Sequence, residues 1–210
     1  MGYANRTGAD VVMLESVDII DNQLRVVAFP YGYAIAEGEV PGHESFERFG
    51  LNADIDIIEE DIWANGGTYV FPAAGQQMEL VSTSVEDDLL TAGLVAGTGI
   101  NTVTLYYLDS TYAAKTEDIN LNGTGVVTTV ATDILRVNSL KAKVCGTGKA
   151  AAGTITIRNL ADTPVYSSIP AGYTRSRNTI YTVPLGKTLY ISSLSLGCSA
   201  TAQSGALIVL

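Results

Sequence analysis

Thr-Val-Thr-Leu-Tyr-Tyr-Leu, at residues 102–108, is the stretch that decides the fold. Its β-branched and aromatic residues favour an extended backbone. Val103, Leu105 and Tyr107 recur at every second position, so they share one face of a strand. A strand with one apolar face needs a second layer of structure to cover that face. The stretch therefore predicts one sheet of a layered β protein.

Similar alternation recurs further along the chain. The residues that we expect to point inward are Ile155 and Ile157, then Leu140, Ala142 and Val144, then Leu189 and Ile191, and the leucines of Ser-Leu-Ser-Leu at 193–196. Turn signals separate these runs, at Gly97-Thr-Gly99, Asn122-Gly123, Gly146-Thr-Gly148 and Pro170-Ala-Gly172. Asn122-Gly123 is expected to close a type I′ hairpin, because both residues tolerate positive φ. Short, regularly spaced strands predict an all-β chain with an antiparallel β-sandwich or jelly-roll-like domain.

The N-terminal part of the chain is built differently. All four Phe residues and the single Trp lie before residue 72. We predict an irregular N-terminal arm or attachment segment with one or two strands over residues 1–75, and the β-sandwich over 76–210. Leu24–Phe29 is a candidate strand. Residues 54–63 fit one face of a helix and a strand equally well, so both alternatives stay open.

Composition excludes some classes of protein. The chain of 210 residues is 47% hydrophobic and only 16% charged, which excludes a disordered chain. Its net charge of -10 argues against nucleic acid as a partner, because the phosphate backbone would be repelled. The charge is divided: residues 1–118 carry 20 acids and 4 bases, whereas residues 119–210 carry 2 acids and 8 bases. Opposite charges on successive segments suggest complementary contacts within an assembly.

No membrane or secretion signal is expected. The N-terminus has neither a basic n-region nor an apolar h-region. Residues 188–210 carry no charge, but serines are spread through them, so a strand fits better than a membrane span. Cys145 and Cys198 belong to no metal or redox motif, and two buried free thiols are the simpler interpretation; a disulfide between them cannot be deduced.

The sequence contains no complete catalytic motif among those considered below, and we predict neither an enzyme nor a cofactor. His43 is the only histidine, it lies in a turn, and no G-x-S-x-G sequence accompanies it. The run from Cys145 to Ala150 is similar to a phosphate loop, but Lys143 and Ala150 occupy positions that require Gly and Ser or Thr. A Gly-rich hairpin turn is the better interpretation.

The first candidate site is acidic. It comprises five carboxylates and a neighbouring indole: Asp54, Asp56, Glu59, Glu60, Asp61 and Trp63. Such oxygen ligands can hold Ca²⁺, but the spacing does not match an EF-hand, and we predict no metal. A glycosidase would need a second matching element and a cleft with flanking aromatics. The remaining alternatives are a solvated face or a contact with a basic partner.

The second candidate site is basic. Arg175 and Arg177 flank Ser176, so on a strand both guanidinium groups point the same way. They can pair with carboxylates such as those of residues 54–61, in the same or a neighbouring subunit. The alternative is two exposed solubilising charges.

An ordered series of short motifs carries a family resemblance over roughly residues 59–191. The series runs Glu59-Glu-Asp-Ile-Trp-Ala-Asn-Gly-Gly-Thr-Tyr-Val-Phe-Pro72, Glu79–Asp87, Ala96–Asp109, Leu121-Asn-Gly-Thr124, Arg136-Val-Asn138, Ala152–Ile157, Ile169-Pro-Ala-Gly-Tyr173 and Tyr181–Thr188. It resembles a family of virion structural proteins of tailed bacteriophages.

The resemblance implies a component of a particle. The expected role is that of a capsid decoration or cement protein, and a fibre or connector protein is the alternative. The implied partners are the major capsid protein or other virion proteins and further copies of the chain, with a homotrimer favoured. The implied location is the virion, assembled in the host cytoplasm. A host-glycan binding module is a further alternative, with Tyr106, Tyr107 and Tyr112 as its platform.

Overall fold

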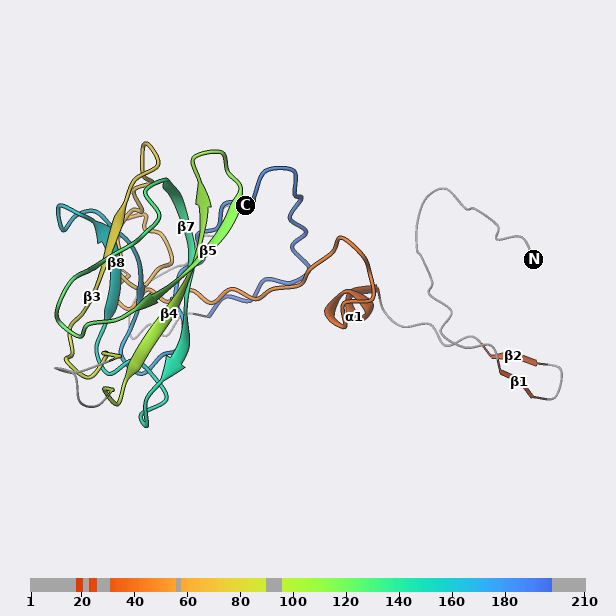
Figure 1. Cartoon of the computed structure of the whole chain (residues 1–210). Helices are drawn as coiled ribbons and strands as arrows, with labels where there is room; N and C mark the ends of the chain where they lie inside the picture. The colour runs from red at the N-terminus through yellow and green to blue at the C-terminus, as the bar shows by residue number, and fades with distance from the viewer. Residues whose placement is uncertain (1–17, 21–22, 26–30, 56–57, 90–95, 198–210) are drawn as a thin grey trace. The chain divides into compact units, whose positions relative to one another are not determined.

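A computed structural model describes residues 18–20, 23–25, 31–55, 58–89 and 96–197. The chain divides into two compact units between Glu47 and Arg48. The first unit contains a short antiparallel hairpin of β1 (Asp18–Ile20) and β2 (Gln23–Arg25), followed by α1 (Tyr31–Ala36) (Figure 1). The boundary at residue 75 that the composition suggests stays a prediction.

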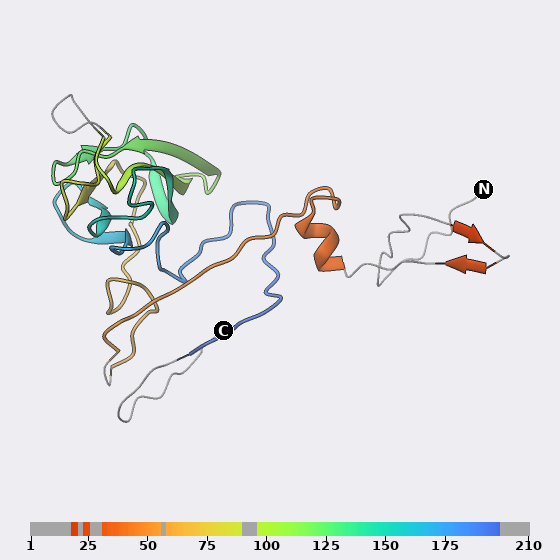
Figure 2. The same ribbon diagram turned by 90° about the horizontal axis from the view of Figure 1, so that it is seen from below.

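The second unit is an antiparallel β-sandwich, as the sequence predicts (Figures 1 and 2). One sheet has the order β6-β3-β8-β9, formed by Val127–Thr128, Met78–Ser82, Ile155–Asn159 and Val165–Ile169. The other has the order β5-β4-β7, formed by Ala114–Asn120, Ile100–Asp109 and Ile134–Cys145. This order does not confirm a jelly roll, which has eight strands.

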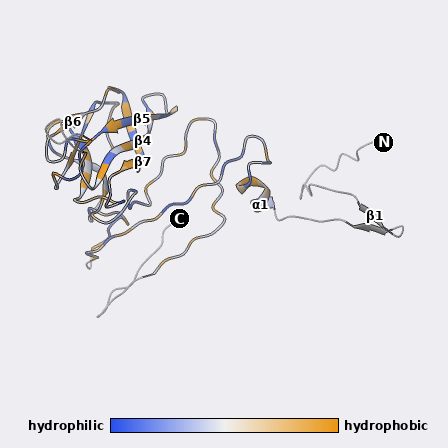
Figure 3. Cartoon of the chain, turned by 60° about the horizontal axis from the view of Figure 1, so that its bottom comes forward, coloured by the Kyte–Doolittle hydropathy of each residue, from blue (hydrophilic) through white to orange (hydrophobic). Residues whose placement is uncertain are grey.

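The core lies between the two sheets. The inward residues predicted from alternation on β4 and β8 are confirmed: Val103, Leu105, Ile155 and Ile157 are fully buried, and Tyr107 is nearly so. Figure 3 shows hydrophobic positions along β4 and β7. Side chains from both sheets meet in one cluster with Trp63 and Tyr69, which come from the segment that precedes β3. Residues 58–75 therefore supply part of the core.

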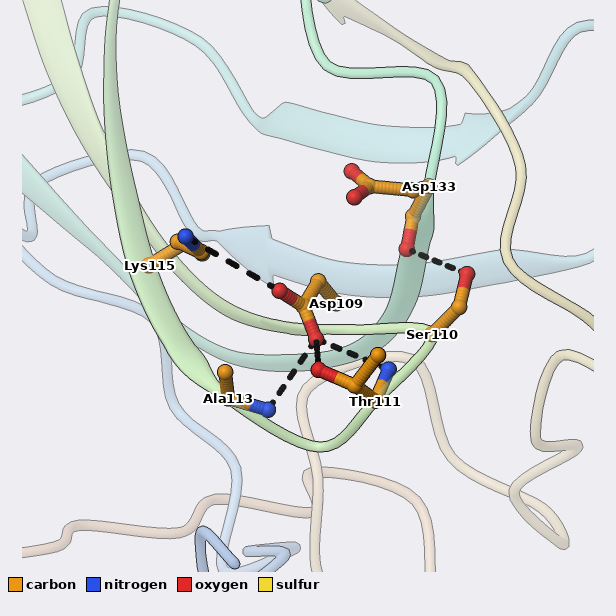
Figure 4. A network of polar contacts seen from close by, with 6 residues as sticks. All are labelled: Asp109, Ser110, Thr111, Ala113, Lys115 and Asp133. Atoms are coloured by element: carbon orange, nitrogen blue, oxygen red, sulfur yellow. Dashed lines mark hydrogen bonds and ion pairs between the residues drawn. The ribbon is translucent and has the colours of Figure 1, made fainter.

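The hairpin between β4 and β5 is closed by a polar network (Figure 4). The carboxylate of Asp109 accepts hydrogen bonds from the amide and hydroxyl of Thr111, at 2.8 and 2.6 Å, and from the amide of Ala113 at 3.0 Å. Lys115 lies 3.9 Å from the same carboxylate. These contacts lower the pKa of Asp109, the Thr111 hydroxyl contributing most. The side chain of Asp109 thus accepts two amides of the turn, and its backbone carbonyl accepts the amide of Tyr112.

Two local predictions on the second unit are wrong. Val144 is exposed rather than inward, because the pairing of β7 with β4 shifts in register where Thr102 lies opposite Val144. Such irregularities re-aim the side chains beyond them. Asn122 does not have positive φ; only Gly123 does, and the amide of Gly125 closes the turn on the carbonyl of Asn122. The turn exists, but it is not the expected type I′ hairpin.

The strands expected at Leu189–Ile191 and at residues 193–196 are also wrong. Residues 187–197 are neither strand nor helix, and they are exposed. A strand forms only where a partner strand accepts its hydrogen bonds. The outer edge of β7 is already occupied by Thr174–Ser176, whose backbone bonds Leu140 and Ala142. Alternation alone could not reveal that this edge was taken.

Candidate functional site

The segment that covers the edge of β7 carries the two predicted arginines. Arg175 lies directly opposite Lys141 in an antiparallel bridge. Ser176, between the arginines, is buried and its hydroxyl accepts the amide of Leu140 at 3.1 Å. The arginines therefore project to the side away from Ser176, as their spacing predicts.

Both guanidinium groups lie over the same aromatic ring. The Cζ atoms of Arg175 and Arg177 are 5.3 and 5.4 Å from the centroid of Phe49. Arg177 is also 4.2 Å from the centroid of Tyr173. Distances below about 6 Å are those of cation–π contacts. The aromatic rings thus gather two like charges on one small area.

Lys141 adds a third cation to this area. Its ammonium group lies 4.8 Å from the ring centroid of Tyr106. The pairing register places Thr104 opposite Lys141 on one side and opposite Asp118 on the other. The carboxylate of Asp118 forms an ion pair with Lys143 and accepts a hydrogen bond from the hydroxyl of Thr104. Both contacts lower the pKa of Asp118, the contact with Lys143 contributing most. We refer to Lys141, Arg175, Arg177, Phe49 and Tyr173 as the cation–aromatic surface.

The cations of this surface have no acidic counterpart in the described part of the chain. None of the ion pairs between described residues includes Lys141, Arg175 or Arg177. The Nε of Arg177 is buried and has no hydrogen-bond partner there. An unsatisfied buried donor costs about 1–3 kcal/mol. The predicted pairing with residues 54–61 of the same chain is therefore not found among these residues.

A fourth cation, Arg48, directly precedes Phe49 in the chain. Arg48 stacks over the ring of Tyr181, with 4.8 Å between Cζ and the centroid. Burial lowers the pKa of Arg48 to about 10, a shift that the nearby Tyr181 opposes. The segment that begins at Arg48 therefore contributes both an aromatic ring, Phe49, and a desolvated charge.

The acidic residues are dispersed rather than convergent. The carboxylate of Asp61 accepts a hydrogen bond of 2.7 Å from the backbone amide of Tyr69, and that of Glu60 accepts one of 2.7 Å from the side-chain amide of Asn52. Asp54 and Glu59 are exposed, and Asp56 lies outside the described residues. Asp54 and Glu60 line a shallow polar hollow together with the Gly66-Gly67 turn. Within the described ranges no three acidic, Cys or His side chains are grouped to hold a metal ion.

Trp63 belongs to the core rather than to the acidic loop. Only 6% of its surface is exposed, and its indole donates to the carbonyl of Gly67 at 3.0 Å. Its ring meets Tyr69 edge-on, Tyr69 meets Phe71 in the same way, and Arg136 lies over Phe71. Burial raises the pKa of Tyr69 well above its usual range. This aromatic series fastens residues 61–71 to the sandwich.

Other residues considered from the sequence are scattered. Tyr106 and Tyr107 lie on opposite faces of β4, and Tyr112 packs against Arg136, so the three do not form one platform. His43 is exposed, as predicted, beside Tyr31. Cys145 is a half-buried free thiol, and its pKa is raised by burial and by the nearby charge of Asp87. Cys198 lies outside the described residues.

The run from Cys145 to Ala150 forms a turn, as predicted, but not a hairpin, because the strands that it joins, β7 and β8, belong to different sheets. The amide of Lys149 closes it on the carbonyl of Gly146 at 3.1 Å. The amides of Gly146 and Gly148 are bonded to the carbonyls of Gly99 and Thr98. These donors are not free to cradle a phosphate.

An apolar segment forms a second unusual surface. The large exposed apolar residues after the sandwich strands are Leu185, Leu189, Tyr190, Ile191, Leu194 and Leu196. Tyr190 is 79% exposed and Leu185 is 76% exposed. We call residues 185–196 the apolar arm; it runs outside the two sheets (Figure 2). No described helix is long and apolar enough to cross a membrane.

Comparison of the chain with protein-family models, with curated proteins and with solved structures finds no match. The sequence pattern predicted the arginines, but not their contacts with Phe49 and Tyr173. Phe49 is remote in sequence from both arginines, and no local pattern marks it. The sequence pattern does not mark Lys141 as part of this site, because the pairing that places it opposite Arg175 is tertiary.

Proposed function

We propose that this protein is a structural component of a particle and acts by binding other subunits. The observation that carries the proposal is the apolar arm, a series of large apolar side chains held outside the sandwich. Contiguous exposed apolar surface marks interaction sites on soluble proteins. The backbone of the arm also forms no strand in its own chain. An arm of this kind gains stability when a partner covers its side chains.

The resemblance of residues 59–191 supports one kind of particle. On it we propose a virion structural protein of a tailed bacteriophage, acting as a capsid decoration or cement protein. A fibre or connector protein is the alternative. The sandwich would supply a stable body, and the segments beside it would make contacts with the major capsid protein and with other copies. A closed homotrimer is the assembly that we favour.

Replacing apolar side chains on the arm tests the proposal. In the full chain, Tyr190→Ser, Ile191→Ser and Leu194→Ser are combined. The matched control combines Val126→Ser, Val130→Ser and Leu160→Ser, which change exposed apolar residues of the sandwich. Mass is measured by light scattering over a range of protein concentrations, and folding by circular dichroism.

We expect the unaltered chain and the control to associate, and the arm variant to remain folded but associate more weakly. Copurification with assembled particles is the second measurement. A chain that is monomeric at every concentration and absent from purified particles would contradict the proposal.

A further inference from the structure

We propose that the cation–aromatic surface binds the exposed carboxylates of Asp54 and Glu59 on a second copy of the chain. This inference rests on the proposed function, because it names the partner through which copies associate. It concerns Lys141, Arg175 and Arg177 on one copy, and Asp54 and Glu59 on the next. The apolar arm is a separate surface, so each can be tested alone.

The three cations form a surface that favours the binding of an anion. Lys141 and Arg175 are directly opposite in their bridge, and like charges so placed repel each other. Arg177 shares the ring of Phe49 with Arg175. The ring holds the guanidinium groups in place but has no oxygen or nitrogen atom to accept hydrogen bonds from their N–H groups. A carboxylate would relieve the repulsion and also accept hydrogen bonds.

Arginines are suited to a carboxylate partner. A guanidinium group presents its donors in a planar fork that matches the two oxygens of a carboxylate. The rings of Phe49 and Tyr173 limit the orientations of the two guanidinium groups, which lowers the entropy cost of binding. The buried Nε of Arg177 shows that part of this surface is already desolvated. Charge pairs in such surroundings are screened less than fully exposed ones.

The complementary anions are present on the same chain. Asp54 and Glu59 are exposed, and no hydrogen bond or ion pair to their carboxylates occurs among the described residues. The neighbouring carboxylates of Glu60 and Asp61 are already bonded within the loop. The acidic residues are concentrated before residue 119 and the basic residues after it. A second copy therefore offers the missing charges without any other molecule.

The contact is heterologous, because a basic surface on one copy meets an acidic segment on another. Each copy then has one surface of each sign, and such contacts close into a ring when the rotation between neighbouring copies closes. This is consistent with the trimer that we favour. It also predicts that association weakens as the salt concentration rises.

A charge-exchange experiment with the full chain tests the contact. Variant one carries Arg175→Glu and Arg177→Glu, and variant two carries Asp54→Lys and Glu59→Lys. A control carries Lys115→Glu and Lys149→Glu, which changes the net charge as variant one does, at exposed positions outside both the cation–aromatic surface and the apolar arm. Lys141→Glu with Arg175→Glu replaces variant one if the change at the half-buried Arg177 prevents folding. Association is measured by sedimentation, and folding by circular dichroism.

We expect variants one and two to associate at least about ten-fold more weakly than the unaltered chain, each by itself. An equimolar mixture of the two should form dimers, because the acidic segment of variant one meets the intact arginines of variant two. A closed ring of three would still contain one repulsive contact between identical variants, so recovery is judged on the dimer. The control should associate like the unaltered chain. This set of results would support the proposal.

Two results would overturn it while leaving the proposed function in place. In the first, the unaltered chain associates with itself, and variant one associates with itself equally well. The other is a mixture that forms no dimers, which would show that the arginines and the acidic segment do not bind each other. An unaltered chain that is monomeric at every concentration would also overturn the inference, and one that is in addition absent from purified particles would contradict the proposed function itself.

Discussion

The hydroxyl of Ser82 donates a hydrogen bond of 2.6 Å to the carboxylate of Asp87, and both residues are buried. The same carboxylate accepts hydrogen bonds of 2.8–2.9 Å from the backbone amides of Ile100, Ala152 and Gly153. Asp87 therefore joins the end of β3 to the start of β4 and to the loop that precedes β8. No cation is needed to hold this charge, since four donors surround it.

Replacing Asp87 with Asn is expected to destabilise the sandwich by about 3 kcal/mol. An amide nitrogen would face at least one of the donors, so buried N–H groups would lose their acceptor. The measurement is chemical denaturation, with Asp54→Asn as a control at an exposed carboxylate. A variant as stable as the control would show that the loops do not depend on this carboxylate.

Gly97 is a second place where the loops approach closely. A Cβ there would overlap the backbone carbonyl of Glu86, which cannot rotate away as a side chain would. We expect Gly97→Ala to lower the free energy of unfolding by about 1–3 kcal/mol. Gly197→Ala is the matched control, because its Cβ would meet nothing within 4 Å. Equal unfolding midpoints for the two variants would be inconsistent with this packing.

The turn at Asp109 makes stability depend on pH. The folded-state pKa of Asp109 is lowered below its unfolded value of about 3.9. Its contribution is thus fully present above that unfolded value and is lost as the pH falls through the folded pKa. Asp109→Asn keeps an acceptor oxygen but removes the charge. We expect the variant to melt below the unaltered chain at pH 6, and the gap to narrow at pH 3.

Thr111→Val provides the companion variant for that turn. It removes the hydroxyl that contributes most to the lowered pKa of Asp109. We therefore expect the pKa of Asp109, followed by NMR, to rise. A gap between the melting temperatures of Asp109→Asn and the unaltered chain that stays constant with pH would contradict the assignment.

Trp63 is a built-in probe, because it is the only tryptophan in the chain. Its buried ring should emit at short wavelength in the folded protein and shift to longer wavelength on unfolding. Trp63→Ala is expected to cost about 3–5 kcal/mol, as for other buried aromatic residues. Trp63→Phe should cost less, because a ring remains against Tyr69. Emission typical of a solvated indole in the folded state would place Trp63 outside the core.

Much of the sandwich could be predicted because its strands follow a local rule. Ile155 and Ile157 alternate with polar residues and are buried, as are Val103 and Leu105. The same rule failed at Leu189 and Ile191, where alternation is present but no strand forms. Alternation shows which face would be apolar; it does not provide a neighbour with free hydrogen-bonding groups.

The candidate site shows the same limit. The spacing of Arg175 and Arg177 was sufficient to place both on one face, since successive side chains on an extended segment alternate. Their contact with Phe49 joins segments about half the chain apart, and Lys141 reaches them through a bridge to another segment. The sequence could not assign a partner to these charges, because only distance in space selects among many possible pairs.

By itself, the sequence determined the class of fold, the division of charge and the positions of the turns, because these depend on periodicity and on residue type. Only the tertiary structure decided that Trp63 lies in the core, that Asp87 joins three segments and that the arginines rest on Phe49. Those relationships arise from the packing of segments distant along the chain. Packing is set by shape and by the satisfaction of buried polar groups, which no short stretch of sequence contains.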